Sequence, residues 1–202
     1  IGGIKPDAAV IVATVRALKY HGGCETDKLK QKNTEALKKG MPNLLRHIKN
    51  VTKQFGLPAV VAINKFPGDT EEELKAIEEA CKKIGVCTCI SDVWSRGGEG
   101  GLKLAEEVLR LCEEGKDVNF IYKDDMSIAE KIESVVTKIY GGDKVEFYPK
   151  ALKSMRELEA MGYGHLPVCI AKTQYSFSDD PALRGCPVGF TVTVKEVSVC
   201  AG

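Results

Sequence analysis

Short apolar runs alternate with longer amphipathic stretches along this chain. The clearest run is residues 59–63, whose β-branched side chains favour a strand buried on both faces. The run ends at Asn64 and Lys65, and Pro67 and Gly68 then predict a sharp turn out of the sheet. This stretch is the clearest strand and turn in the sequence.

A helix is expected directly after this turn. Thr70 and Glu73 have the spacing of a capping box, in which each side chain binds a backbone N–H group near the other residue. Apolar residues at helical spacing follow, namely Leu74, Ile77, Cys81 and Ile84. The order is strand, loop and helix, and open α/β sheets bind ligands at such loops.

The same alternation continues through the chain. Further strands are expected at residues 8–15, 86–93, 120–122, 145–148, 166–171 and 189–200, the last half-exposed and either antiparallel or at an edge. Helices are expected between residues 24 and 40 and around 44–55, 102–112, 128–139 and 152–158. The pattern predicts an α/β fold with a mainly parallel sheet flanked by helices. We expect residues 1–115 to form one portion and residues 116–202 a smaller α/β portion.

Four polar loops each follow an expected strand. They are residues 16–23, 64–69, 94–101 and 172–181. In a parallel sheet all four would open at the same edge, so their positions predict a shared cleft.

Composition narrows the class of protein. The 202 residues are 44% hydrophobic and 28% charged, and the net charge is +1, so nothing favours nucleic acid or an anionic membrane as partner. No apolar run approaches the roughly 20 residues of a membrane-spanning helix. The eight cysteines include no C-x-x-C pair and are expected to be reduced core thiols of a cytoplasmic protein, without a metal site. Since Ile1 stands where Met is usual, we expect a piece of a longer protein.

Two aromatic residues and a polar pair lie on these loops. Asn64-Lys65 is similar to the base-reading N-K-x-D loop of nucleotide-binding proteins, but Pro67 replaces the aspartate, which favours the alternative of a simple turn with a solvated lysine. Phe66 and Trp94 follow neighbouring strands and could clamp a flat ring, or could pack as core.

A glycine-rich loop and a basic cluster complete the candidates. Gly97 and Gly98 begin a G-G-E-G-G run that suits either an anion cradle or a tight turn, and no Walker A motif occurs in the 202 residues. Arg16, Lys19 and His21 follow the first strand and suit phosphate or carboxylate binding, or a solvated surface.

An acidic pair lies in the last of the four loops. Asp179 and Asp180 precede Pro181, where they suit cation binding, acid–base chemistry or simple turn formation.

Several segments resemble the formate–tetrahydrofolate ligase family. They are residues 12–23, 62–67, 94–101, 138–141 and 171–180, in the family's order. The resemblance extends over essentially the whole chain. It implies a P-loop NTPase-like context and a ligase that uses MgATP, formate and tetrahydrofolate, forms formyl phosphate and transfers the formyl group to N10. It also implies activation by a monovalent cation, K⁺ or ammonium, and a cytoplasmic homotetramer acting on small molecules.

The resemblance also assigns residues. It implies that Phe66 and Trp94 sandwich the folate rings, with Pro67 and Ile90 nearby. It places Asn64, Lys65, Arg16, Gly97 and Gly98 along the same cleft. The family's P-loop and formyl phosphate residues lie in an amino-terminal part that these 202 residues lack. Catalytic residues therefore stay unassigned, and we expect a folate-binding wall that is inactive alone.

Other functions stay open. The chain suits a stand-alone folate- or nucleotide-binding module, or half of a split enzyme. A GTPase-type nucleotide binder is a further alternative, against which the missing P-loop and the interrupted N-K-x-D motif argue.

Overall fold

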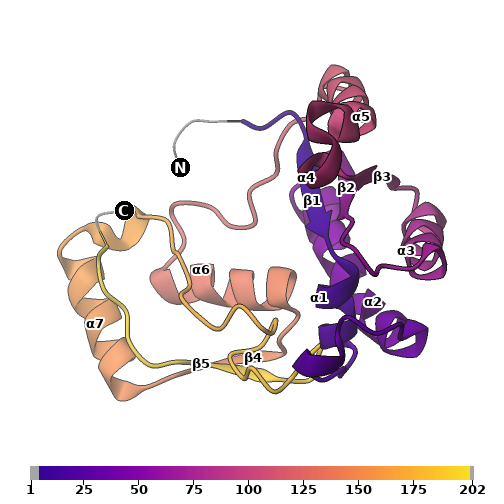
Figure 1. The fold of residues 1–202 in the computed structure, drawn as a ribbon. Helices are drawn as coiled ribbons and strands as arrows, with labels where there is room; N and C mark the ends of the chain where they lie inside the picture. The colour runs from indigo at the N-terminus through magenta and orange to yellow at the C-terminus, as the bar shows by residue number, and fades with distance from the viewer. Residues whose placement is uncertain (1–4, 201–202) are drawn as a thin grey trace. The chain divides into compact units, whose positions relative to one another are not determined.

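The computed structural model describes residues 5–200, which form two compact units (Figure 1). The larger unit comprises residues 5–119 and Arg184–Cys186, and the smaller comprises Phe120–Leu183 and residues 187–200. Residues 1–4 and 201–202, at the ends of the two expected portions, lie outside the described part. The expected boundary at residues 115 and 116, between a folate-cleft portion and a second α/β portion, stays a prediction.

A three-stranded parallel sheet is the centre of the larger unit. Its order is β1 (Ala9–Ala13), β2 (Ala59–Asn64) and β3 (Cys87–Ser91), so that β2 is central. Ala9 lies opposite Ala59, and Val60 lies opposite Cys87. The predicted α/β fold with a parallel sheet is therefore confirmed, and β2 is buried from Ala59 to Ile63 as its apolar run predicts.

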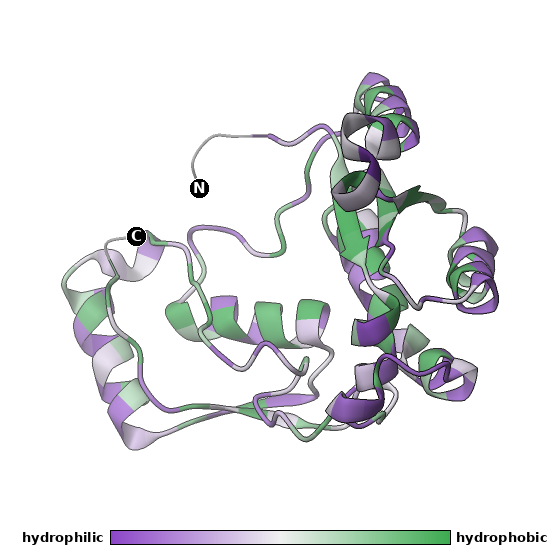
Figure 2. Cartoon of the chain, viewed as in Figure 1, coloured by the Kyte–Doolittle hydropathy of each residue, from purple (hydrophilic) through white to green (hydrophobic). Residues whose placement is uncertain are grey.

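Helices cover both faces of this sheet. Their bounds are α1 Val15–His21, α2 Thr34–Lys49, α3 Glu71–Lys83, α4 Val93–Arg96 and α5 Leu102–Glu113. A π-helical turn extends α2 over Asn50–Gln54, and 3₁₀ turns occur at Thr26–Lys28 and Gly97–Gly101. Figure 2 shows β1 and β2 as mainly apolar, whereas α3 and α5 each carry apolar and polar residues.

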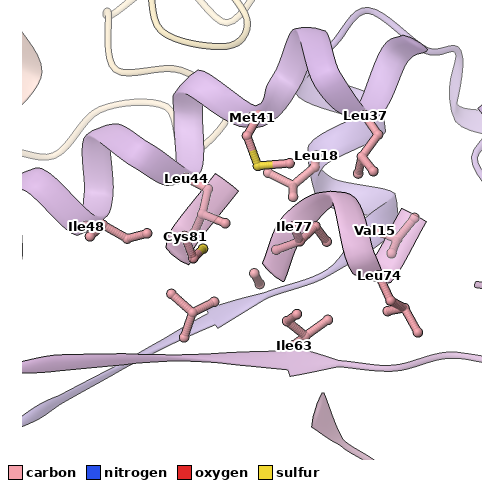
Figure 3. Close-up of a cluster of buried hydrophobic side chains, with 12 residues drawn as sticks. Val15, Leu18, Leu37, Met41, Leu44, Ile48, Ile63, Leu74, Ile77 and Cys81 are labelled. Carbon is pink, nitrogen blue, oxygen red and sulfur yellow. The ribbon is translucent and has the colours of Figure 1, made fainter. Parts of the chain in front are cut away.

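The main core lies between the sheet and helices α1, α2 and α3. Figure 3 shows side chains from these three helices and from β2 pointing toward one another. The labelled members are Val15, Leu18, Leu37, Met41, Leu44, Ile48, Ile63, Leu74, Ile77 and Cys81. Burying one such Leu or Ile side chain contributes ~1.5–3 kcal/mol. On the opposite face, Leu111 of α5 packs against Val60 and Cys89.

The smaller unit has its own core and a two-stranded parallel sheet. Its elements are α6 Ile128–Val135, a π-helical turn Val136–Tyr140, β4 Lys144–Phe147, α7 Pro149–Ala160, a 3₁₀ turn Tyr163–His165 and β5 Thr191–Val194. The core includes Ile132, Met155, Phe177 and Phe190. β5 pairs in parallel with β4 and lies at an edge, so the antiparallel alternative is wrong.

Two expected strands are wrong. Residues 120–122 and 166–171 have no strand structure. Side chains rather than a neighbouring strand bind the backbone of the second segment: Lys131 Nζ donates to the Leu166 carbonyl oxygen (3.1 Å), and the Val168 N–H donates to Tyr122 Oη (3.1 Å). Loop 172–181 therefore follows no strand and lies in the smaller unit, so the predicted edge of four loops is reduced to three.

Two expected loops contain helices. Residues 16–23 lie largely in α1, because the Thr14 hydroxyl caps it by accepting from the Ala17 N–H (3.0 Å). Residues 94–101 form the end of α4 and a 3₁₀ turn.

The cysteines are only partly core residues. All eight are free, and Cys24, Cys81 and Cys89 are buried. Burial raises the pKa of both Cys81 and Cys89 to about 11, which makes their thiolate forms even rarer at neutral pH than those of an ordinary cysteine. Cys112 and Cys169 are exposed, contrary to expectation: Cys112 follows the buried Leu111 and so points away, and Cys169 lies in the segment that forms no strand.

Candidate functional site

Three segments come together at the carboxyl edge of the larger sheet. Arg16 lies in the first turn of α1, Lys65 and Phe66 directly follow β2, and Trp94 lies in α4 after β3. The Lys65 N–H donates to the Ser91 carbonyl oxygen (3.1 Å), which holds the end of β2 against β3. Parallel pairing thus brings the three segments to one edge, as predicted.

A closed turn holds Phe66. The Phe66 N–H donates to Asp69 Oδ2 (2.8 Å), and the Asp69 N–H donates to the Phe66 carbonyl oxygen (3.1 Å). Gly68 has a φ of +95°, a conformation that favours glycine. Lys65 Nζ lies 3.4 Å from Glu71 Oε1, so the lysine is ion-paired at the surface. Asp69 therefore closes the turn, and Thr70 caps α3.

Trp94 is fixed at one end and exposed at the other. Its indole Nε1–H donates to the Lys65 carbonyl oxygen (2.9 Å), whereas the residue is 60% exposed. Trp94 is therefore no core residue of the larger unit. Phe66 is half-buried, and its ring makes no direct contact with the Trp94 ring among the described ring contacts. Two aromatic side chains thus flank one turn without packing on each other.

The remaining predicted residues surround this turn. Pro67 is exposed, Ile90 is 36% exposed near the end of β3, and Asn64 is half-buried opposite Ser91. Gly97 and Gly98 are exposed on the 3₁₀ turn. All of them lie in the larger unit.

Gly100, in the same glycine-rich turn, has no room for a side chain. A Cβ atom at Gly100 would lie 2.4 Å from the Asp92 carbonyl oxygen, whereas one at Gly98 would meet nothing within 4 Å. The Asp92 N–H donates to the Gly100 carbonyl oxygen (3.2 Å), which closes the loop. Sequence reasoning grouped these glycines together, since only the approach of the backbone distinguishes them.

The structure separates the three residues of the basic cluster. Lys19 is 1% exposed, its Nζ lies 2.8 Å from Glu73 Oε1, and it also donates to the Gln31 carbonyl oxygen (2.8 Å). Lys19 is therefore a buried structural residue and is not available to a ligand. Arg16 alone of the three reaches the Phe66 turn, with its guanidinium carbon 4.6 Å from the ring centroid.

Glu73, which lies in α3, connects this helix to α1 through Lys19 and to the start of α2 through Asn33. It accepts from the backbone N–H groups of Asn33 (3.0 Å) and Thr70 (3.1 Å), which are the N-caps of α2 and α3. The predicted capping box is present. Burial alone would raise the pKa of Glu73, but hydrogen bonds from Lys19, Asn33 and Thr70 outweigh it and lower the pKa to about 2.

His21 contacts a segment far away in the sequence. The Gly185 N–H donates to His21 Nδ1 (3.3 Å), and Asn43 Nδ2 donates to the Gly185 carbonyl oxygen (2.8 Å). The Arg184 guanidinium stacks on the Tyr20 ring at 4.1 Å. Burial, and secondly the charge of Arg184, lower the pKa of His21. This histidine therefore anchors Arg184–Cys186 to α1.

The acidic pair binds backbone groups of the smaller unit. Asp179 Oδ2 accepts from the Thr193 N–H (3.0 Å), and Asp180 Oδ1 accepts from the Ala182 N–H (2.8 Å). These contacts agree with the turn-forming interpretation. Within residues 5–200 no group of three or more His, Cys, Asp or Glu side chains is placed to hold a metal ion. No helix in this part of the chain has the length and apolarity needed to span a membrane.

Comparison with known proteins decides the family. A family model described as formate–tetrahydrofolate ligase matches residues 1–202. The chain belongs to this family. A curated formate–tetrahydrofolate ligase from Symbiobacterium thermophilum is 49% identical over 202 residues, which is all of this chain and 36% of that protein. The chain thus spans about a third of the length of this ligase.

Within this ligase-family chain, four of the residues singled out from the sequence lie at the Phe66 turn. Arg16, Lys65, Phe66 and Trp94 come together in the larger unit. Sequence reasoning missed the role of Gly100 and the anchoring of Arg184–Cys186. The apolar pattern carried no signal for either, since both depend on contacts of the folded backbone.

Proposed function

We propose that this chain supplies the folate-binding wall of an ATP-dependent ligase. That ligase joins formate to tetrahydrofolate through formyl phosphate and yields 10-formyltetrahydrofolate. Family membership and the 49% identity to a ligase support the reaction class. The observation that supports the wall is the exposed Trp94 ring, which its bond to Lys65 holds beside the Phe66 turn.

The chemistry of folate suits these side chains. The pyrimidinone ring of the tetrahydropterin is flat and conjugated, although its second ring is reduced, and stacking of a flat ring on an aromatic side chain contributes ~0.5–1.5 kcal/mol beyond the burial of area. We assign one pterin face to Phe66 and the other to Trp94, with Pro67 and Ile90 as the apolar rim. Exclusion of water between the rings would strengthen any polar contact to the pterin edge.

Polar groups of the same edge are assigned to the rim of the cleft. Asn64 and Lys65 lie at the end of β2, and Gly97 and Gly98 present exposed backbone on the 3₁₀ turn. We propose that they line the cleft and orient the bound folate, so that this chain contributes positioning to catalysis.

The phosphate chemistry belongs outside these residues. The 202 residues contain no Walker A motif, so we assign the binding of MgATP and of the monovalent cation, K⁺ or ammonium, to other parts of the ligase. The cytoplasmic homotetramer and the P-loop NTPase-like context are likewise proposals that rest on the family. The boundary between residues 115 and 116 is proposed as the limit of the folate portion.

Fluorescence of the single tryptophan tests the wall. We would titrate tetrahydrofolate anaerobically against Trp94 emission, correct for the inner filter effect, and verify folding by circular dichroism. We expect saturable quenching. Phe66→Ala should raise the apparent Kd by about 2- to 13-fold, because it removes one aromatic stack. Trp94→Phe controls for non-specific signal. A folded chain without saturable quenching would refute the proposal.

The coverage of 36% is consistent with a piece of a longer ligase, and half of a split enzyme is the alternative. With MgATP, formate and tetrahydrofolate, the pure chain should form no 10-formyltetrahydrofolate, and turnover would contradict both the inactive folate wall and the half of a split enzyme. An upstream Walker A motif in the same reading frame would decide for a longer single chain. Mg²⁺-dependent GTP binding would instead favour a GTPase-type protein.

A further inference from the structure

One face of the Phe66 ring is occupied by a charged group of the protein itself. The Arg16 guanidinium carbon lies 4.6 Å from the ring centroid, well inside the range of a cation–π contact. Arg16 and Phe66 follow different strands, β1 and β2, whose parallel pairing brings them together. The contact is therefore a product of the tertiary fold.

No other partner explains the position of Arg16. Within the described residues the Phe66 ring is its sole side-chain partner, and it belongs to no ion pair. It occupies the first turn of α1, where the helix dipole disfavours a cation, whereas Lys19 and His21 occupy the favoured last turn. An arginine at this position does not stabilise the helix, so its contact with Phe66 is the feature that accounts for it.

The Phe66 ring needs such a contact. Asp69 fixes its backbone, but its half-buried side chain belongs to none of the hydrophobic core clusters of the described residues. A guanidinium held over one face restricts the ring, so a flat ligand would stack on the opposite face. The positive charge also polarises the ring against which the ligand stacks.

We propose that Arg16 is a positioning residue, which acts through the Phe66 ring to prepare it for stacking on the pterin. This inference rests on the proposed folate-binding function. It differs from direct recognition, in which the guanidinium would bind the glutamate carboxylates of folate. The two roles predict different responses to the glutamate part of the ligand.

Two ligands and three variants separate these roles. The ligands are tetrahydrofolate and tetrahydropteroate, which lacks glutamate, and both are titrated against Trp94 emission in the whole chain. Arg16→Gln removes the charge, and Arg16→Lys keeps it. Lys39→Gln, at an exposed position of α2, controls for the loss of one positive charge elsewhere. Circular dichroism verifies the fold of each variant.

We expect Arg16→Gln to weaken both ligands equally, by about two- to five-fold, the size of an exposed cation–π contact. Arg16→Lys should restore part of the affinity, and Lys39→Gln should change neither Kd. A loss for tetrahydrofolate alone would assign Arg16 to the carboxylates and overturn the positioning role. Unchanged binding in Arg16→Gln would overturn it as well, with the folate wall intact. Absence of binding in the unmodified chain would refute the wall itself and this inference with it.

A second readout does not depend on folate. The Nε–Hε resonance of Arg16 should show an upfield ring-current shift in a ¹H–¹⁵N spectrum, and Phe66→Leu should abolish it. An unshifted resonance in the unmodified chain would show that the stack does not form in solution, and would overturn the inference whatever the folate titration gives.

Discussion

The buried pair Lys19–Glu73 makes the stability of the larger unit depend on pH in a defined window. Glu73 is fully buried, and its pKa of about 2 lies below its ordinary value of 4.5. Each pKa unit corresponds to ~1.36 kcal/mol, so ionised Glu73 stabilises the folded state by roughly 3 kcal/mol. Because the folded pKa is the lower one, this stabilisation is complete above pH 4.5 and is lost as the pH falls from 4.5 toward 2.

Glu73→Gln tests this account. The change leaves the Lys19 ammonium buried without its anion, and breaking such a pair costs about 3–5 kcal/mol. Urea unfolding, followed by Trp94 fluorescence and circular dichroism, should show this loss at pH 7. The difference between the variant and the unmodified chain should shrink as the pH falls below 4.5, because the carboxyl group of the unfolded chain then binds a proton, whereas that of the folded chain stays ionised until the pH approaches 2.

A matched control isolates the buried carboxylate. Glu79 lies exposed on the same helix, α3, so Glu79→Gln should leave the unfolding midpoint unchanged at every pH. A difference between Glu73→Gln and the unmodified chain that stays constant from pH 7 to pH 3 would refute the electrostatic reasoning. It would show that packing, rather than the charge, accounts for the loss.

Two further predictions follow from the backbone contacts. Gly100→Ala places a methyl group 2.4 Å from the Asp92 carbonyl oxygen and should lower the free energy of unfolding by about 1–3 kcal/mol. Gly98→Ala meets no atom within 4 Å and should be tolerated. Equal thermal midpoints for the two variants would contradict this prediction. The pKa of His21 is lowered in the folded chain, so its contribution to the free energy of unfolding is complete above pH 6.5 and is lost as the pH falls below that value. His21→Gln should therefore flatten the dependence of stability on pH between pH 8 and pH 5.5. An unchanged profile in urea unfolding would exclude His21 as its source.

Short-range sequence patterns were sufficient to predict the central strand of the larger unit and the helix that follows it. The apolar run of β2 and the spacing of Thr70 and Glu73 are local signals, since the side-chain repeat and the capping box depend on residues close in sequence. Alternation of strands and helices then favours parallel pairing, which places the ends of three strands at one edge. The candidate residues Phe66 and Trp94 were found on this basis and by family resemblance.

Residues distant in sequence decided the rest. The sequence predicted a basic cluster of Arg16, Lys19 and His21. In the structure Arg16 lies over the Phe66 ring, Lys19 is buried against Glu73, and His21 anchors Gly185. The apolar segment 166–171 resembles a strand locally, yet side chains of Lys131 and Tyr122 take its backbone groups instead. Local periodicity describes which face of an element is apolar, whereas the partner of a charge or an unpaired backbone group is determined only when the chain has folded around it.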